Sequence, residues 1–378
     1  MSAIIKGKQI IIFSPQPWSY LYISKHHYAR LLAENNTVYF ITAPAFNKNS
    51  PGLWEMPEPG RNLEVLTFSV PFPERVKFYF PAFYKYIFRK RIGKIFKKRK
   101  IAPDITIDFG CYSEFDNLDF ISSAQKIFFP VDDKGFLVGD TRGADLVVSV
   151  SRNIVDKYLN AGKKAYFINH GLSEEFSRIA RSSLLDLSYT QGQPLRFGFA
   201  GNLFSTFMDF VVMEQVVSQH PDIIFELFGS MKHDRTNQQH VNWNRFMHES
   251  SNIRIRGLVS PAELAGEYEK MDGFLLCYKP DYINYHAENS HKILEYLSAG
   301  KILVSTYVSI YKDLNLICMS DKDRNEDLPA IFAEAVIHVK SWNETARMQA
   351  RINYALDNTY IRQLERIQEL LLKSNAIL

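Results

Sequence analysis

Residues 287–300 read Ala287-Glu-Asn-Ser-His-Lys-Ile-Leu-Glu-Tyr-Leu-Ser-Ala-Gly300. The segment predicts a short helix, because Asn289 or Ser290 can cap its start and the final glycine can end it. Lys292 then lies in the first turn, and Glu295 lies one turn further along on the same side. Free N–H groups at a helix start together with a lysine suit a pyrophosphate, and a carboxylate can accept the hydroxyl protons of a ribose. The segment therefore indicates a nucleotide site, although an exposed Lys–Glu pair on an amphipathic helix has the same spacing.

Short apolar strands and amphipathic helices alternate on both sides of this segment. The predicted strands lie at 10–13, 38–41, 63–68, 105–108, 126–131, 146–150, 165–168, 196–200, 223–228, 253–256, 274–277 and 302–305. The predicted helices lie at 24–35, 83–100, 151–160, 208–219, 261–271, 290–299, 342–358 and 360–373. Such alternation predicts parallel sheets covered by helices on both faces.

The pattern begins twice in 378 residues, which predicts an α/β chain of two Rossmann-like doubly wound domains. We expect a first domain at 1–180, a second at 190–355, and a final helix at 356–378 that crosses back to the first domain. The polar stretch 178–194 is expected to link the two domains. Ligands in such sheets bind beyond the carboxyl ends of the strands, so two domains that face each other would form a binding cleft.

The segment Ser290-His-Lys-Ile-Leu-Glu-Tyr-Leu-Ser-Ala-Gly-Lys301 resembles the donor-binding stretch of glycosyltransferase family 4 and its relatives, which runs Ser/Pro-x-Lys-x-x-Glu-Tyr-Leu-Ala-x-Gly-Lys. Five further segments resemble elements of that family in the same order, at 144–151, 169–176, 197–202, 224–229 and 252–272. The resemblance covers most of the chain. It implies the GT-B fold, in which two Rossmann-like domains face a cleft, and transfer of a sugar from a nucleotide donor, most often a UDP-sugar.

The resemblance also implies a set of donor-binding residues in the second domain. Lys292 would hold the phosphates, Glu295 the ribose, and Tyr278 would flank the base or the sugar. The full set is Gly201, Asn202, Gly229, Arg256, Gly257, Tyr278, Asn289, Ser290, His291, Lys292 and Glu295. The chain departs from the family where many relatives carry a second glutamate eight residues before Glu295, because Ala287 occupies that position.

Two adjacent aspartates, Asp132 and Asp133, follow a predicted strand of the first domain. Their position matches the place where many relatives carry a catalytic or acceptor-binding histidine. Neighbouring carboxylates raise the pKa of one member, which suits a general base for an acceptor hydroxyl. The pair resembles that of teichuronic-acid and xanthan-type glycosyltransferases and would imply an inverting enzyme. Asp pairs are also common in simple turns.

Trp18, His26 and His27 follow the first predicted strand and are candidates for the acceptor side. The aromatic ring of Trp18 can stack on a sugar or cover the edge of the sheet. A solvated or core-edge histidine is a commoner role for His26 and His27 than catalysis.

Composition and short motifs indicate the cellular compartment and exclude several classes of ligand. The three cysteines, Cys111, Cys277 and Cys318, form no CxxC pair, which favours a reducing compartment. No signal-peptide pattern and no apolar run of ~20 residues is present, so we expect a cytoplasmic protein. The sequence contains no GxGxxG motif, no metal-ligand cluster and no nucleic-acid motif. We therefore expect no metal, no cofactor and no nucleic-acid partner.

Residues 75–100 carry eleven Lys and Arg residues interleaved with aromatic residues. The predicted helix at 83–100 can lie on the anionic inner face of a cell membrane as a peripheral contact. A solvated helix face over the first domain is the alternative.

Together these features predict a hexosyltransferase-type glycosyltransferase that acts on a cell-surface polysaccharide or a lipid-linked glycan. Two alternatives share the same residues: a nucleotide-sugar epimerase of the same fold, and a non-catalytic scaffold that binds a glycan or nucleotide. An epimerase would turn over its donor without an acceptor. A scaffold would tolerate loss of both Asp132 and Asp133.

Overall fold

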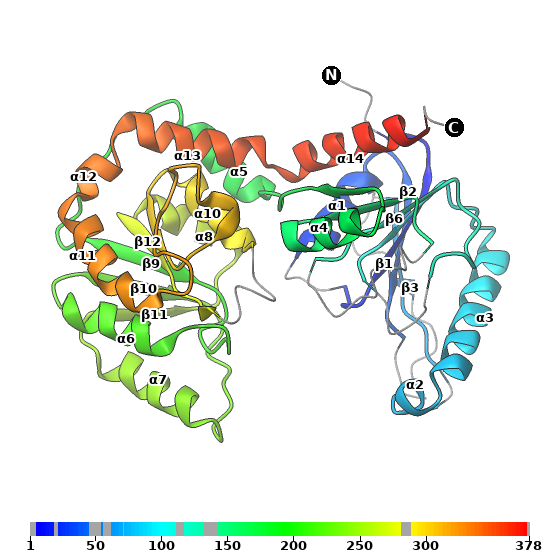
Figure 1. Ribbon diagram of the computed structural model, residues 1–378, viewed down its shortest axis with the longest axis horizontal. Coiled ribbons are helices and arrows are strands. Elements are labelled where there is room, and N and C mark those ends of the chain that lie inside the picture. Colours follow the sequence, from blue (N-terminus) through cyan, green and yellow to red (C-terminus); the bar gives the residue numbers. More distant parts are fainter. Residues whose placement is uncertain are drawn as a thin grey trace. The chain divides into compact units, whose positions relative to one another are not determined.

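The computed structural model describes residues 5–18, 22–44, 54–55, 62–70, 72–110, 117–131, 143–280 and 289–375. The chain divides into two compact units, shown in Figure 1. Unit 1 comprises Met1–Asn169 and Tyr360–Leu378, and unit 2 comprises His170–Thr359. The first division precedes position 180, where the sequence analysis expected it. Helix α5 (Glu174–Ser183) already belongs to unit 2, because its Phe176 packs against Tyr268 with ring centroids 5.5 Å apart.

Unit 1 contains a sheet of eight described strands in the order β3-β4-β2-β1-β5-β6-β7-β8. The strands are β1 (Gln9–Ser14), β2 (Thr37–Thr42), β3 (Trp54–Glu55), β4 (Leu63–Leu66), β5 (Ile105–Asp108), β6 (Gln125–Phe128), β7 (Leu146–Ser149) and β8 (Ala165–Phe167). All neighbours pair in parallel except β3 with β4. Strands β1, β5 and β7 are almost wholly buried, as expected for parallel strands covered on both faces.

The described helices of unit 1 are α1 (Ser24–Ala33), α2 (Val76–Tyr79), α3 (Pro81–Arg99), α4 (Arg152–Asn160) and α14 (Tyr360–Asn375). The last of these contributes Ile367 and Leu371 to the same core as α1 and β1. Its first residue, Tyr360, stacks on His27 with ring centroids 4.4 Å apart. The C-terminal helix is therefore an integral part of unit 1, although all of unit 2 separates it from the rest of that unit in the sequence.

Unit 2 contains a parallel sheet in the order β11-β10-β9-β12-β13-β14. The strands are β9 (Arg196–Ala200), β10 (Ile224–Phe228), β11 (Ile253–Gly257), β12 (Gly273–Leu276), β13 (Ile302–Ser305) and β14 (Cys318–Met319). The helices other than α5 are α6 (Phe210–Gln219), α7 (Gln238–Glu249), α8 (Pro261–Glu269), α10 (His291–Ser298), α11 (Leu328–Ile337), α12 (Val339–Trp342) and α13 (Thr345–Asp357). The order 3-2-1-4-5-6 is that of the doubly wound dinucleotide fold. Its switch point lies between β9 and β12.

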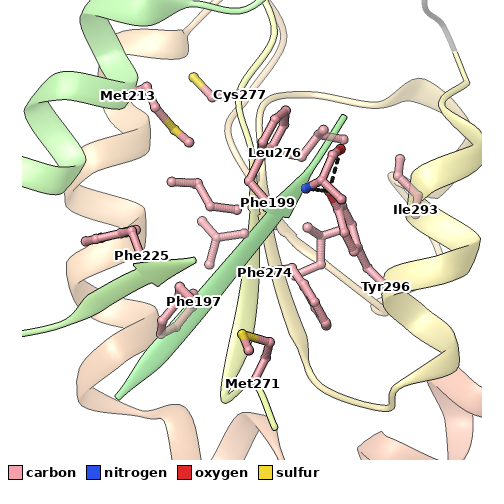
Figure 2. Close-up of a cluster of buried hydrophobic side chains, with 14 of the residues drawn as sticks. Phe197, Phe199, Met213, Phe225, Met271, Phe274, Leu276, Cys277, Ile293 and Tyr296 are labelled. Atoms are coloured by element: carbon pink, nitrogen blue, oxygen red, sulfur yellow. Dashed lines mark hydrogen bonds between the residues drawn. The ribbon is translucent and has the colours of Figure 1, made fainter. Parts of the chain in front are cut away.

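The core of unit 2 lies on both faces of β9 and β12 (Figure 2). Phe197 and Phe199 of β9 alternate with Gly198, against which the ring of Phe274 packs. Tyr296 of α10 stacks on Phe274 with centroids 4.5 Å apart. Helix α10 is thus held against the middle of the sheet by aromatic packing.

The predicted fold class is confirmed, since both sheets are doubly wound and, apart from the β3–β4 pair, parallel. The sequence analysis did not predict α5, α7 and α11. Helix α7 shows why: it is rich in Gln, Asn and His, and only His240, Trp243 and Met247 of its residues are buried. Their spacing is helical, but the polar residues around them hide the pattern. None of the described helices has the length and apolar character needed to cross a membrane.

Candidate nucleotide-binding site

Three glycines lie at the carboxyl ends of three neighbouring strands of unit 2. Gly201 follows β9, Gly229 follows β10, and Gly257 ends β11. The Gly201 N–H donates to the carbonyl of Phe228 (2.8 Å), and the Gly229 N–H donates to the carbonyl of Gly257 (2.7 Å). We call these three residues the glycine ledge.

Two of the three ledge positions, Gly201 and Gly229, require residues without side chains. Gly201 and Gly229 have φ values of 149° and 144°, which residues with a Cβ rarely adopt. A Cβ on Gly229 would lie 1.6 Å from the Gly201 carbonyl oxygen. A Cβ on Gly201 would lie 2.4 Å from Lys292 Nζ. The backbones of Gly201 and Gly229 therefore pack directly on each other, and the Lys292 ammonium group occupies the space that a side chain at position 201 would fill.

Lys292 lies in the first turn of α10 with its ammonium group beside the ledge. Its Nζ donates to the hydroxyl of Tyr278 (2.7 Å) and lies 5.4 Å from the centre of the Phe199 ring. Tyr278 comes two residues after β12, and Gly201 comes one residue after β9, so the cation sits at the switch point of the sheet. This is where doubly wound sheets bind ligands.

Helix α10 is placed by Tyr296, whose hydroxyl reaches across to the last residue of β9 (Figure 2). The Ala200 N–H donates to this hydroxyl at 3.0 Å, and the hydroxyl lies 3.4 Å from the Ala200 carbonyl oxygen. Tyr296 belongs to the motif at 290–301, where the sequence by itself indicates no role for it. Its contact sets the position of Lys292 relative to the ledge, because both belong to the same short helix.

Glu295 lies one turn after Lys292 and is mostly enclosed by protein, with 22% of its side chain exposed. Burial raises the pKa of Glu295 to about 7, and the positive charge of Lys292 opposes part of that rise. The nearest His291 ring nitrogen lies 3.9 Å from the carboxylate. Near neutral pH the carboxyl group therefore takes up or releases a proton easily, and hydrogen bonds from a ligand would favour its charged form.

The start of α10 is held by His170, which lies in the family-like segment 169–176 and was not among the predicted site residues. The His170 ring donates from Nε2 to the Asn289 carbonyl (3.1 Å), and burial lowers the pKa of His170 to about 4. The ring packs edge-on against His291, with centroids 5.9 Å apart. Ser290 is the first residue before the helix, yet its hydroxyl makes no capping hydrogen bond. No sequence spacing could pair residues 170 and 289.

Tyr278 is positioned by a residue that the sequence does not single out. The side-chain amide of Asn325 donates to the Tyr278 carbonyl (2.7 Å) and to a carboxylate oxygen of Asp209 (2.9 Å). Asp209 caps α6 through the N–H of Val212. These bonds connect the loops after β9 and β12, which lie far apart in the sequence.

Two predicted donor residues make other contacts. Asn202 accepts from the N–H of Phe204 (3.1 Å) and shapes the loop after β9. The Arg256 guanidinium points back along the sheet toward Glu226, with Nη1 3.1 Å from a carboxylate oxygen. Arg256 lines an open groove of about 860 Å³ that Lys292 and Glu295 do not line. The structure therefore does not bring Arg256 together with the lysine and glutamate of α10.

The predicted catalytic residues of unit 1, Asp132 and Asp133, lie outside the described residues. The predicted acceptor-side residues Trp18, His26 and His27 make contacts within the fold. Both ring nitrogens of His26 are engaged, since Nδ1 accepts from the Ile23 N–H and Nε2 donates to the Pro17 carbonyl. Burial lowers the pKa of His26 to about 4. His27 stacks on Tyr360, and Trp18 packs edge-on against His26 at 5.1 Å. These contacts give His26 a structural role.

Lys25 is a candidate that the sequence analysis missed. Only 5% of the residue is exposed, its ammonium group contacts the Gln16 side-chain oxygen, and it lies 5.8 Å from the centre of the Phe109 ring. Gln16 and Phe109 follow β1 and β5, whose ends form the switch point of unit 1. In the sequence, a lysine at the start of a helix does not indicate that its side chain is buried. Across the described ranges, no three His, Cys, Asp or Glu side chains are placed to hold a metal ion.

No protein-family model matches the sequence, and no curated protein sequence matches it. Solved structures do match over almost the whole chain. Sucrose-phosphate synthase from Thermosynechococcus elongatus is 12% identical, with a TM-score of 0.64 over 98% of this chain and 100% of that one. This chain has the GT-B fold.

Two further GT-B structures show the same likeness. The alpha,alpha-trehalose 6-phosphate synthase of Burkholderia multivorans is 11% identical, with a TM-score of 0.66 over 99% of this chain and 98% of that one. The HepE protein of Anabaena, in complex with UDP and glucose, is 11% identical, with a TM-score of 0.60 over 96% of this chain and 99% of that one. The TM-scores over almost the whole chain establish the GT-B fold, and at 11–12% identity the likeness shows the fold alone.

Proposed function

We propose that this protein is a glycosyltransferase that uses a nucleotide-sugar donor, bound by unit 2. The observation that carries the proposal is the position of the Lys292 ammonium group beside Gly201 at the switch point, with Glu295 one turn further on the same helix. The Lys292 cation and the N–H groups at the start of α10 provide two kinds of contact for a diphosphate. The carboxylate of Glu295 provides acceptors for the two hydroxyls of a ribose.

The donor we propose is a UDP-sugar, because the HepE protein with this fold was solved with UDP and glucose. The resemblance of residues 290–301 to glycosyltransferase family 4 supports the same class. In the transfer, the bond from the anomeric carbon to the diphosphate oxygen breaks and a bond to the acceptor oxygen forms. The proton of the acceptor hydroxyl passes to a base, for which we propose Asp132 or Asp133. The diphosphate leaves with the charge that Lys292 stabilises.

For the acceptor we propose a cell-surface polysaccharide or a lipid-linked glycan, bound by unit 1. The resemblance of the Asp132–Asp133 pair to teichuronic-acid and xanthan-type enzymes supports this choice. The buried ammonium group of Lys25 at the unit 1 switch point adds a polar group that could hold such an acceptor.

The first experiment measures the melting temperature with uridine, guanosine, adenosine, cytidine and thymidine diphosphates. A ligand at ~100 times its Kd stabilises the folded state by about 2.7 kcal/mol, a shift of roughly 5–10 °C for a unit of this size. We expect UDP to give this shift for the wild type and Glu249→Ala, which removes an exposed carboxylate at the end of α7. We expect Glu295→Ala and Lys292→Met to weaken UDP binding by about 10–100-fold.

Turnover separates the proposal from its alternatives. Release of UDP from UDP-hexoses that depends on an added acceptor and is lost in Asp132→Ala/Asp133→Ala would support transfer. Conversion of the donor sugar without an acceptor would identify an epimerase instead. Nucleotide binding with no turnover under either condition would identify a scaffold. Absence of binding by all five diphosphates would contradict the proposed site.

A further inference from the structure

One surface of unit 1 exposes a cluster of aromatic side chains. Phe78, Tyr79 and Phe80, at the end of α2, are 69%, 75% and 65% exposed, and Phe83 and Tyr86 of α3 are 52% and 59% exposed. Among the described residues, every Phe, Tyr or Trp that is more than half exposed lies in this segment. We call these five residues the aromatic corner.

The corner is not needed to pack α3 onto unit 1. The buried face of α3 consists of Tyr84, Phe88 and Ile92, one turn apart along the helix. Phe88 and Ile92 belong to the core that also contains β1 and β4 residues, and the Phe88 ring lies 5.4 Å from that of Phe68. The aromatic residues of this segment thus divide into an inner set, Tyr84 and Phe88, and an outer set, the aromatic corner. Water-exposed rings of the outer set are costly unless something covers them.

The outer face of α3 continues from the corner as a row of lysines. Phe83, Tyr86, Lys90, Lys94 and Lys97 follow at spacings of three or four residues, so they lie on one side of the helix, and all five are exposed. Figure 1 shows α2 at the start of α3. Phe83 and Tyr86 of the corner lie on the same side of α3 as the lysines. Lys90 Nζ lies 5.7 Å from the centre of the Tyr86 ring at the point where the two groups meet.

The positive charge of this segment is not offset by acidic residues within the segment. Residues 75–103 contain eleven Lys and Arg residues and no Asp or Glu. Glu74, just before this segment, forms an ion pair with Lys77, 3.1 Å apart. A surface of this kind is complementary to a sheet of anionic groups over an apolar layer.

We propose that the aromatic corner and the lysine row of α3 dock this protein on an anionic lipid bilayer. The rings enter the interface between headgroups and acyl chains, where aromatic side chains are favoured, and the lysines contact the lipid phosphates. Protein–protein interfaces are depleted of lysine at their centres, so this row does not suit a protein partner. The surface belongs to unit 1 and involves none of the proposed nucleotide-binding residues, so this inference goes beyond the proposed function and does not depend on it.

The experiment is co-sedimentation of the full chain with phosphatidylcholine vesicles and with vesicles of equal parts phosphatidylcholine and phosphatidylglycerol. We expect binding to the anionic vesicles only, weakened by salt. Lys90→Gln/Lys94→Gln/Lys97→Gln should weaken that binding about a hundredfold, since each lysine near a charged surface contributes about 1 kcal/mol, which is about a fivefold gain. Phe78→Ser/Tyr79→Ser/Phe80→Ser should weaken it comparably.

Matched controls use exposed residues elsewhere. Lys322→Gln/Lys340→Gln/Lys373→Gln changes the net charge equally, and Leu185→Ser/Val211→Ser/Ile337→Ser removes apolar residues that are 89%, 64% and 72% exposed. Both control variants should bind as the wild type does. Thermal unfolding and the UDP-induced shift of every variant would show that the fold and nucleotide site are unchanged.

Three results would overturn the proposal. One is equal binding to both vesicle types, and another is equal binding by the corner, lysine-row and control variants. The third is a concentration-dependent dimer that the Ser variants of the corner abolish while vesicle binding stays absent, which would make a second copy of this chain the occupant.

Discussion

At the scale of single residues, Glu295 links the candidate site to pH. The pKa of this carboxyl is about 7 in the folded chain, above the ordinary value of ~4.3. The native state therefore binds more protons than the unfolded state between these values, and stability falls as pH rises from ~4.3 to 7. Glu295→Gln should lack this fall, so its stability relative to the wild type should grow by about 2–3 kcal/mol between pH 5 and pH 8.

Urea unfolding at pH 5 and pH 8 measures this difference. UDP binding provides a second readout, because a ribose that donates to Glu295 requires the ionised carboxylate. As pH rises through 7, the UDP affinity of the wild type should increase more steeply than that of Glu295→Gln. The Glu295→Gln variant also controls for the titration of the nucleotide. Parallel pH profiles for the two proteins would contradict the assigned role of Glu295.

The glycine ledge makes a second prediction at this scale. Gly229→Ala places a Cβ against the Gly201 carbonyl, which cannot move away, whereas Gly201→Ala meets the end of the flexible Lys292 side chain. Both add about 1–3 kcal/mol of backbone strain. Gly229→Ala should lower the free energy of unfolding more, while Gly201→Ala should mainly weaken UDP binding by displacing Lys292.

The matched control is Gly266→Ala in α8, where a Cβ meets nothing within 4 Å. This change should be neutral or stabilise the fold by about 0.5–1 kcal/mol. Chemical denaturation and UDP titration of the three variants test the series. Equal losses of stability in all three would show that the ledge is not as closely packed as described.

At the scale of elements, two helices of unit 2 begin with serine but use it differently. The Ser260 hydroxyl accepts from the Glu263 N–H at the start of α8, and Glu263 accepts from the Ser260 N–H in return (2.9 Å). Ser290 makes no such bond at the start of α10. Ser260→Ala should therefore cost about 0.5–2 kcal/mol of stability without changing UDP affinity.

Ser290→Ala should show the reverse pattern, with little change in stability and weaker UDP binding. A helix start whose hydroxyl does not cap its own backbone keeps that hydroxyl for a diphosphate. Both variants need only denaturation curves and a UDP titration. Loss of stability in Ser290→Ala together with unchanged affinity would remove Ser290 from the candidate site.

At the scale of the whole molecule, the C-terminal helix belongs to the unit that the N-terminus begins. Ile367 of α14 is buried in the core of unit 1, whereas Ile361 of the same helix is 42% exposed. Ile367→Ala should destabilise unit 1 by about 2–5 kcal/mol, and Ile361→Ala should cost much less. UDP affinity should stay unchanged in both, because the proposed nucleotide site lies in unit 2.

Calorimetry with and without UDP would resolve this prediction. The transition that UDP raises should be the one that Ile367→Ala leaves unaltered, provided the units unfold separately. A large loss of UDP affinity in Ile367→Ala would indicate that the nucleotide site depends on unit 1.

The sequence alone was enough to predict the fold class and the helix that carries Lys292 and Glu295. Apolar runs of four to six residues and helical spacings are local properties, and the side chains of Ser290, Lys292 and Glu295 fall on the start of one helix through local geometry. Helix α7 and the short strand β14 show no such clear pattern in the sequence, so they could be identified only from the structure.

Only the tertiary structure decided which distant residues meet. The contacts of His170 with Asn289, Asn325 with Tyr278, and Gly201 with Lys292 join segments that are separated by 119, 47 and about 90 residues. The same holds for the aromatic segment at 78–88, which the sequence presents as one cluster. Packing of α3 buried Tyr84 and Phe88 and left the aromatic corner in solvent, because a helix can turn only one face toward the core.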